Sequence, residues 1–222
     1  MKISTFVSGE KYQHMIKPFV NSASRFHEIH IFCTKEIKTD GLNVIRHDIN
    51  FDYTKDKIKN LLKKQNMWAH IIKELGESIL MDIDIIILDK LDLPNSDIIF
   101  TVDKRWSNEY DYINSGVFYS NNLEFMEEWG KLTEKVNPDV AINPPYMGVA
   151  QTALHQLIGF EKGKIKYNWN GLDIIGIPCD IYNHYNDKKL LLKETKVLHY
   201  KNRWQGGLNP SKERMNIIKK FI

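Results

Sequence analysis

Cysteine and long apolar runs are both scarce in this chain of 222 residues. Its two cysteines, Cys33 and Cys179, form neither a metal-binding spacing nor a disulfide framework, so we interpret both as small buried apolar residues. Nowhere do about 18 uncharged apolar residues follow one another, as a membrane-spanning helix requires. The apolar run at the start is too short for a signal peptide. We therefore expect a cytoplasmic protein, at most peripheral to a membrane.

The remaining composition is that of an ordinary globular domain, with 42% hydrophobic and 27% charged residues. The net charge of +3 is unevenly distributed, because the segment from Asp187 onward has ten Lys and Arg against three Asp and Glu. Such a basic segment either forms a solvated face or binds an anion, such as a diphosphate, an anionic lipid surface or nucleic acid.

Strand and helix patterns alternate along the chain, which predicts an α/β fold. Strands are expected at residues 2–8, 29–33, 43–45, 97–102 and 112–120. A long helix should end before Gly76, and another should start from a cap at Asn121 or Asn122 and run toward Lys135. Further helices are expected around residues 15–20, 150–154 and 211–221.

Two aspartates interrupt the most apolar strand pattern of the chain, S-I-L-M-D-I-D-I-I-I-L-D-K-L-D-L at residues 78–93. An unpaired buried carboxylate costs several kcal/mol, so Asp82 and Asp84 must be neutralised, exposed at a strand end, or bound to a cation. In one continuous strand both side chains point to the same face, with Cα atoms about 7 Å apart. The pattern therefore indicates either a site for one hard divalent cation or a turn between two strands.

Three motifs together resemble GT-A type nucleotide-diphospho-sugar glycosyltransferases, especially the galactosyltransferase-like members with a D-x-D motif and a late histidine. They are L-M-D-I-D-I-I-I-L, I-N-S-G-V-F-Y-S and V-L-H-Y-K-N-R-W, in the family's order over most of the chain. The resemblance implies a single GT-A (Rossmann-like) domain over residues 1–222, with a mixed, mostly parallel central sheet flanked by helices. Residues 1–84 would form the nucleotide-binding half, and residues 85–222 the half for donor sugar and acceptor, including the C-terminal metal and diphosphate segment.

The resemblance also implies the ligands of a metal ion and of the donor. Asp82, Asp84 and His199 would bind Mn²⁺ or Mg²⁺. Donor contacts would come from Phe6, Tyr12, Ser115, Gly116, Lys201, Arg203 and Trp204. The family's H-F-x-G-x-x-K-P-W ending has a longer gap and a proline that this chain lacks, so the choice between the lysine and the arginine as diphosphate contact stays open.

For catalysis, the resemblance implies Asn114 as a partner of sugar hydroxyls and Gln151 near the anomeric centre. Relatives have D-Q where this chain has Ala150 before the glutamine. Asp173, or Asp103, would be the base of an inverting reaction. The presence of Gln151, as in families with a late histidine, instead favours a reaction that retains the anomeric configuration. Each residue also has a structural interpretation, with the asparagine and Asp173 as turn caps.

We therefore predict a metal-dependent glycosyltransferase that moves a sugar from a nucleoside-diphosphate donor to an acceptor hydroxyl. The nucleoside diphosphate that we expect is UDP. The acceptor is a glycan, a lipid, a protein or a modified DNA base. Three alternatives stay open. One is a metal-dependent phosphohydrolase, although such sites usually gather more His and Asp than this chain clusters. The substitution of Ala150 and the altered ending fit a catalytically silent nucleotide-sugar-binding domain, and the basic C-terminal segment fits a glycosyltransferase acting on modified bases of phage DNA.

Overall fold

The computed structural model describes residues 1–51, 57–103, 111–137, 148–184, 191–200 and 212–222. They divide into two compact units. The first unit comprises Met1–Phe51, Met81–Asp92 and Asp180–Ile222, and the second comprises Asp52–Leu80 and Leu93–Cys179. The functional division at residue 84 stays a prediction.

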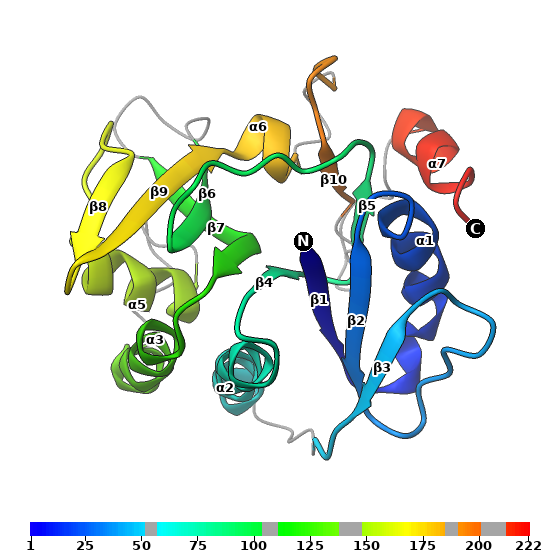
Figure 1. Cartoon of the computed structure of the whole chain (residues 1–222), viewed down its shortest axis with the longest axis horizontal. Helices are drawn as coiled ribbons and strands as arrows, with labels where there is room; N and C mark the ends of the chain where they lie inside the picture. Colours follow the sequence, from blue (N-terminus) through cyan, green and yellow to red (C-terminus); the bar gives the residue numbers. More distant parts are fainter. Residues whose placement is uncertain (52–56, 104–110, 138–147, 185–190, 201–211) are drawn as a thin grey trace. The chain divides into compact units, whose positions relative to one another are not determined.

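The first unit begins with three parallel strands, β1 (Lys2–Val7), β2 (Glu28–Cys33) and β3 (Ile45–Asp48), in the order β3-β2-β1. The short helix η1 (Glu10–Tyr12) and helix α1 (Gln13–Ala23) connect β1 to β2 (Figure 1). Helix α1 lies where one was expected, around residues 15–20, and its apolar residues Met15, Ile16, Phe19 and Val20 are buried.

A two-stranded sheet completes the first unit. Strand β5 (Ile85–Ile87) pairs antiparallel with β10 (Val197–His199), and the two lie side by side in Figure 1. Along the sequence, the short helix α6 (Cys179–Tyr182) precedes β10, and helix α7 (Lys212–Ile218) follows it. One apolar cluster connects this two-stranded ribbon, β5 and β10, to the last helix, α7, and consists of Ile86, Leu198, Tyr200 and Ile218. The pairing therefore brings the chain near residue 85 against the chain near residue 199.

The second unit combines helices with a mixed part of the central sheet. Its helices are α2 (Lys57–Leu75), α3 (Leu123–Lys135) and α5 (Val149–Ile158). Its strands β6 (Ile98–Asp103), β7 (Tyr112–Ser120), β8 (Lys166–Trp169) and β9 (Leu172–Pro178) have the order β7-β6-β9-β8. The β6–β9 pair is parallel, whereas β6–β7 and β8–β9 are antiparallel. Strand β4 (Ser78–Met81) contributes residues to both units.

Local sequence explains the ends of these helices. The side chain of Asn122 accepts a hydrogen bond from Phe125 N and caps α3, as predicted. Gly76 has a φ of 77° and its N–H donates to the Ile72 carbonyl at 2.9 Å, which ends α2. Between these elements, Trp68 of α2, Phe118 of β7 and Trp129 of α3 form a buried aromatic cluster in the core of the second unit, with ring centroids 4.8–6.2 Å apart.

The predicted α/β class with a mixed, mostly parallel central sheet is confirmed, and this sheet has eight strands within the described residues. One strand was misplaced: β3 occupies Ile45–Asp48 rather than residues 43–45. At this edge Arg46 pairs with Asp48 at 2.6 Å, so polar side chains fill a strand that an apolar pattern does not mark. Among the described residues, no helix has the length and apolarity to span a bilayer.

The apolar run at residues 78–93 is not one strand. Strand β4 belongs to the central sheet and β5 belongs to the two-stranded sheet. Asp82 and Asp84 lie between them, where the chain leaves one sheet and enters the other. The expectation of a continuous strand with both carboxylates on one face is therefore wrong, and the alternative of a turn between two strands describes the backbone.

Candidate metal centre

The backbone brings Asp84 and His199 together although they are far apart in sequence. The ribbon register pairs His199 with Ile85, the residue that follows Asp84. In addition, Tyr200 N donates a hydrogen bond to the Asp84 carbonyl at 3.1 Å. On the other side, the carbonyl of Met81, which precedes Asp82, accepts a hydrogen bond from Thr5 Oγ1 at 2.9 Å. Both ends of the D-x-D segment are thus fixed within the first unit.

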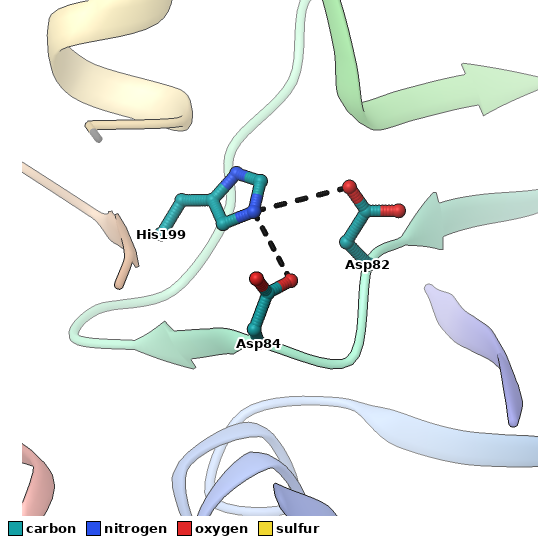
Figure 2. A group of neighbouring side chains, drawn as sticks. All are labelled: Asp82, Asp84 and His199. Atoms are coloured by element: carbon teal, nitrogen blue, oxygen red, sulfur yellow. Dashed lines mark hydrogen bonds and ion pairs between the residues drawn. The ribbon is translucent and has the colours of Figure 1, made fainter. Parts of the chain in front are cut away.

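Three side chains converge at this point, as Figure 2 shows. His199 Nε2 lies 3.1 Å from Asp84 Oδ1 and 3.9 Å from Asp82 Oδ2. One ligand atom from each residue lies within 4.8 Å of the other two. The imidazole is buried, whereas the two carboxylates retain 26% and 22% of their side-chain exposure and can be reached from solvent. The structure therefore places all three predicted metal ligands in one cluster.

The second ring nitrogen of His199 is also engaged. Its Nδ1 lies 2.9 Å from Oδ1 of Asn183, a fully buried residue that follows α6. Because an amide oxygen only accepts, Nδ1–H is the donor in this hydrogen bond. The sequence analysis did not single out this asparagine, and nothing in its local pattern distinguishes it from a turn residue.

The negative charge of the cluster contributes to a pKa shift of a neighbouring residue, Tyr200. Burial, and after it the charge of Asp84, raises the pKa of the Tyr200 hydroxyl. Two carboxylates and one neutral imidazole form a donor set that fits a hard or borderline divalent cation, with oxygen ligands suited to Mg²⁺ and the added nitrogen suited to Mn²⁺. The residues present therefore fit such an ion.

No protein-family model matches the chain. No curated protein sequence matches it either. Solved structures do match. A glycosyltransferase involved in the glycosylation of the major capsid of PBCV-1 superposes with a TM-score of 0.57 at 12% identity, over 99% of this chain and 100% of that one. The galactosyltransferase LgtC, in complex with donor and acceptor sugar analogs, gives 0.57 at 12% identity, over 99% and 95%.

A third match is the glycosyltransferase GlyE of Streptococcus pneumoniae TIGR4, with a TM-score of 0.58 and 13% identity. It covers all of this chain, which spans 60% of the length of GlyE. The chain has the GT-A fold. At these identities the likeness is one of fold, so any activity has to be argued from the residues of this GT-A chain itself.

Two of the predicted donor contacts, Phe6 and Tyr12, lie in the described part of the first unit. Phe6 is half-buried in β1, and its ring centroid lies 4.6 Å from that of Phe51. Tyr12 ends η1, with Lys11 Nζ 4.7 Å from its ring centroid. Their donor roles stay predictions. Lys201, Arg203 and Trp204 lie outside the described residues.

In the second unit, Asn114, Ser115 and Gly116 lie on β7, as predicted. Asn114 Oδ1 accepts a hydrogen bond from Gly116 N at 2.9 Å, and the β6–β7 register shifts between Phe100 and Thr101. This geometry fits a bulge in the β6–β7 pair and the structural alternative of a capping asparagine. The predicted roles of the three residues in sugar binding are not tested by it.

The remaining candidates also belong to the second unit. Gln151 is half-buried on α5, with its side chain folded over Gly148. Asp173 is exposed on β9, where its N–H donates to Asp97 Oδ2 at 2.9 Å. Asp103, the other proposed base, is 1% exposed. Exposure therefore favours Asp173 over Asp103 as the group that a substrate can reach.

Proposed function

We propose that this protein is a metal-dependent glycosyltransferase that moves a sugar from a nucleoside-diphosphate donor to an acceptor hydroxyl. The observation that carries the proposal is the convergence of Asp82, Asp84 and His199 within 4.8 Å in a chain with the GT-A fold. The three similar structures named above are glycosyltransferases, and LgtC was solved with donor and acceptor sugar analogs. By the sequence resemblance the donor is a UDP-sugar.

Breaking the bond between the sugar and the diphosphate leaves negative charge on the leaving group. A bound Mn²⁺ or Mg²⁺ supplies Lewis-acid stabilisation of that charge. The protein's part is to hold oxygen and nitrogen donors in place for the ion, because preorganised groups need no rearrangement during the reaction. Asp82 and Asp84 provide charge and oxygen, and His199 provides a neutral nitrogen from a buried strand end. By the sequence resemblance, we propose that Lys201 or Arg203, together with Trp204, contacts the diphosphate.

For the sugar, we propose that Asn114 and Gln151 contact its hydroxyls and anomeric centre, and that Ser115 and Gly116 line the same pocket. Phe6 and Tyr12 are proposed to contact the base and ribose. If the reaction inverts the anomeric configuration, the exposed carboxylate of Asp173 is the base that removes the acceptor proton. These assignments follow the sequence motifs, and the acceptor class remains a glycan, lipid, protein or modified DNA base.

Calorimetric titration tests the donor site. UDP and the other nucleoside diphosphates are titrated into the protein with Mn²⁺ and then with EDTA, and the experiment is repeated on Asp84→Asn. Asp92→Asn is the matched control, since its carboxylate is 67% exposed and pairs with Lys90 and Lys196 in the same unit. We expect one diphosphate to bind only with metal and only when Asp84 is intact. Binding that ignores both the metal and the substitution contradicts the proposal.

One observation favours a second candidate, a nucleotide-sugar-binding domain without activity. Ala150 stands where the resembling family has a sugar-binding aspartate, and it is 7% exposed while its carbonyl accepts a hydrogen bond from Trp129 Nε1 at 2.8 Å. Residue 150 is therefore buried against α3 and offers no carboxylate. Release of UDP from UDP-sugars in the presence of Mn²⁺, even with water as acceptor, would exclude the inactive domain.

A further inference from the structure

Asn183 is a buried residue that contacts the candidate metal centre without being one of its three predicted ligands. It is 0% exposed, and its Oδ1 lies 2.9 Å from Nδ1 of His199, which is itself 4% exposed. Burial of an amide side chain is costly unless its polar atoms are hydrogen-bonded. The hydrogen bond with the imidazole therefore offsets the cost of burying this side chain, and it connects Asn183 to the metal centre.

The backbone holds the asparagine in register with β10. His184 N, the next residue along the chain, donates to the Val197 carbonyl at 2.9 Å, and His199 N donates back to the His184 carbonyl at 2.9 Å. Lys196, the residue before Val197, donates its N–H to the Ile181 carbonyl at 2.8 Å. The segment that carries Asn183 thus runs hydrogen-bonded along the strand that carries His199, so the relative position of the two side chains is set by main-chain contacts.

This arrangement decides which nitrogen of the imidazole carries the hydrogen. A neutral imidazole has one N–H and one lone pair. In the neutral imidazole that a metal ligand has to be, a hydrogen on Nδ1 donated to the amide oxygen leaves the lone pair on Nε2, which faces Asp84 Oδ1 at 3.1 Å and Asp82 Oδ2 at 3.9 Å. The lone pair is what a cation needs. With the hydrogen on Nε2 instead, the imidazole would donate to the Asp84 carboxylate and occupy both ligands at once.

We propose that Asn183 is a positioning residue that fixes the tautomer and ring orientation of His199 for a divalent cation shared with Asp82 and Asp84. The inference rests on the proposed function, since it assumes that the cluster binds metal. Outer hydrogen-bond partners of metal-binding histidines contribute to metal affinity in this way, and their loss costs about 10- to 100-fold.

The test is calorimetric titration of MnCl₂ alone into the full chain. Asn183→Leu keeps the volume and removes the acceptor, and we expect it to weaken Mn²⁺ binding about 10- to 100-fold. Asn183→Asp restores an oxygen acceptor at the same place, so we expect it to recover most of the lost affinity. Thr195→Val is the matched control. Thr195 is also buried, at 5% exposure, but its Oγ1 donates to the Asp180 carbonyl at 3.1 Å and not to the imidazole.

A second set of titrations asks whether Asn183 acts through His199. In the His199→Ala background, we expect Asn183→Leu to have no further effect on Mn²⁺ affinity, because the residue it positions is already absent. Thermal unfolding in EDTA checks that each variant is folded. Equal losses in both backgrounds, or a loss with Thr195→Val as large as with Asn183→Leu, would overturn the positioning role.

The two proposals fail in different ways. If the unaltered protein binds Mn²⁺ and needs Asp84 and His199, but Asn183→Leu binds it equally well, the positioning role is wrong and the metal centre stands. If the unaltered protein does not bind Mn²⁺, the metal centre is wrong and the positioning role falls with it. The Co²⁺-substituted protein gives an independent readout, since a change of its visible absorption in Asn183→Leu reports an altered imidazole ligand.

Discussion

Mn²⁺ should raise the melting temperature of this protein, and Asp84→Asn should abolish the rise. A ligand that binds only the folded state stabilises it by about 2.7 kcal/mol at a concentration 100 times its Kd. For a chain of this size 1 kcal/mol corresponds to roughly 2–4 °C, so the expected rise is roughly 5–10 °C. The premise holds for this cluster because its ligands come from positions 115 residues apart, which only the folded chain brings together.

The variant separates charge from shape. Asparagine keeps the volume of Asp84 and an atom that can contact His199, so in EDTA we expect the melting temperature to stay within about 4 °C of the unaltered protein. Asp92→Asn, which removes an exposed carboxylate from the same unit, should leave the Mn²⁺ effect intact. Far-UV circular dichroism with MnCl₂ or EDTA measures all three proteins. The reasoning is refuted if Mn²⁺ does not move the unaltered protein, or moves Asp84→Asn equally.

Three further predictions concern the second unit. Trp129→Phe should lower the free energy of unfolding by about 1–3 kcal/mol in urea titrations, because the buried Ala150 carbonyl loses its hydrogen bond; a null effect would mean that water replaces the indole. Burial, the larger cause, and a glutamate hydrogen bond raise the pKa of Tyr119 from 10.0 to about 12. Stability should therefore fall as pH rises between these values, since the unfolded chain releases this proton first, and Tyr119→Phe should remove part of the fall seen by pH-dependent urea unfolding. Gly148→Ala should destabilise by about 1–3 kcal/mol, because its φ is 138° and the added Cβ would lie 2.6 Å from Gln151 Oε1. Adding Gln151→Ala should recover only the part due to the clash, and full recovery would argue against backbone strain.

Elements with strong local patterns could be predicted from sequence, and elements defined by their partners could not. Strand β7 spans the predicted residues 112–120, and α3 begins at its predicted cap, Asn122. The sequence analysis did not predict the β8–β9 hairpin, although Asn170 and Gly171 carry the positive φ angles, 49° and 89°, of a tight hairpin turn. The Asn-Gly pair between apolar residues is a strong hairpin signal that was in the sequence.

The candidate metal site shows the same limit more sharply. The D-x-D was visible because two carboxylates in an apolar run demand an explanation. The break between β4 and β5 was not, since both strands are apolar and only their different partners distinguish them. Asn183 gave no signal at all. Its contact with His199 depends on the register between β10 and the segment after α6, which is a property of the folded chain.

The division into two units has a consequence for how the proposed function can be dissected. Asp82, Asp84, His199 and Asn183 all belong to the first unit. The proposed metal ligands and Asn183 therefore all lie within that unit, and substitutions in the second unit, such as Gln151→Ala, should leave Mn²⁺ affinity unchanged even where they abolish sugar transfer. If such a substitution weakened Mn²⁺ binding in the absence of nucleotide, a residue outside the cluster would have to belong to the metal centre. Metal affinity and transfer rate are thus two separate measurements on one chain, and their disagreement in a given variant would show which step its residue serves.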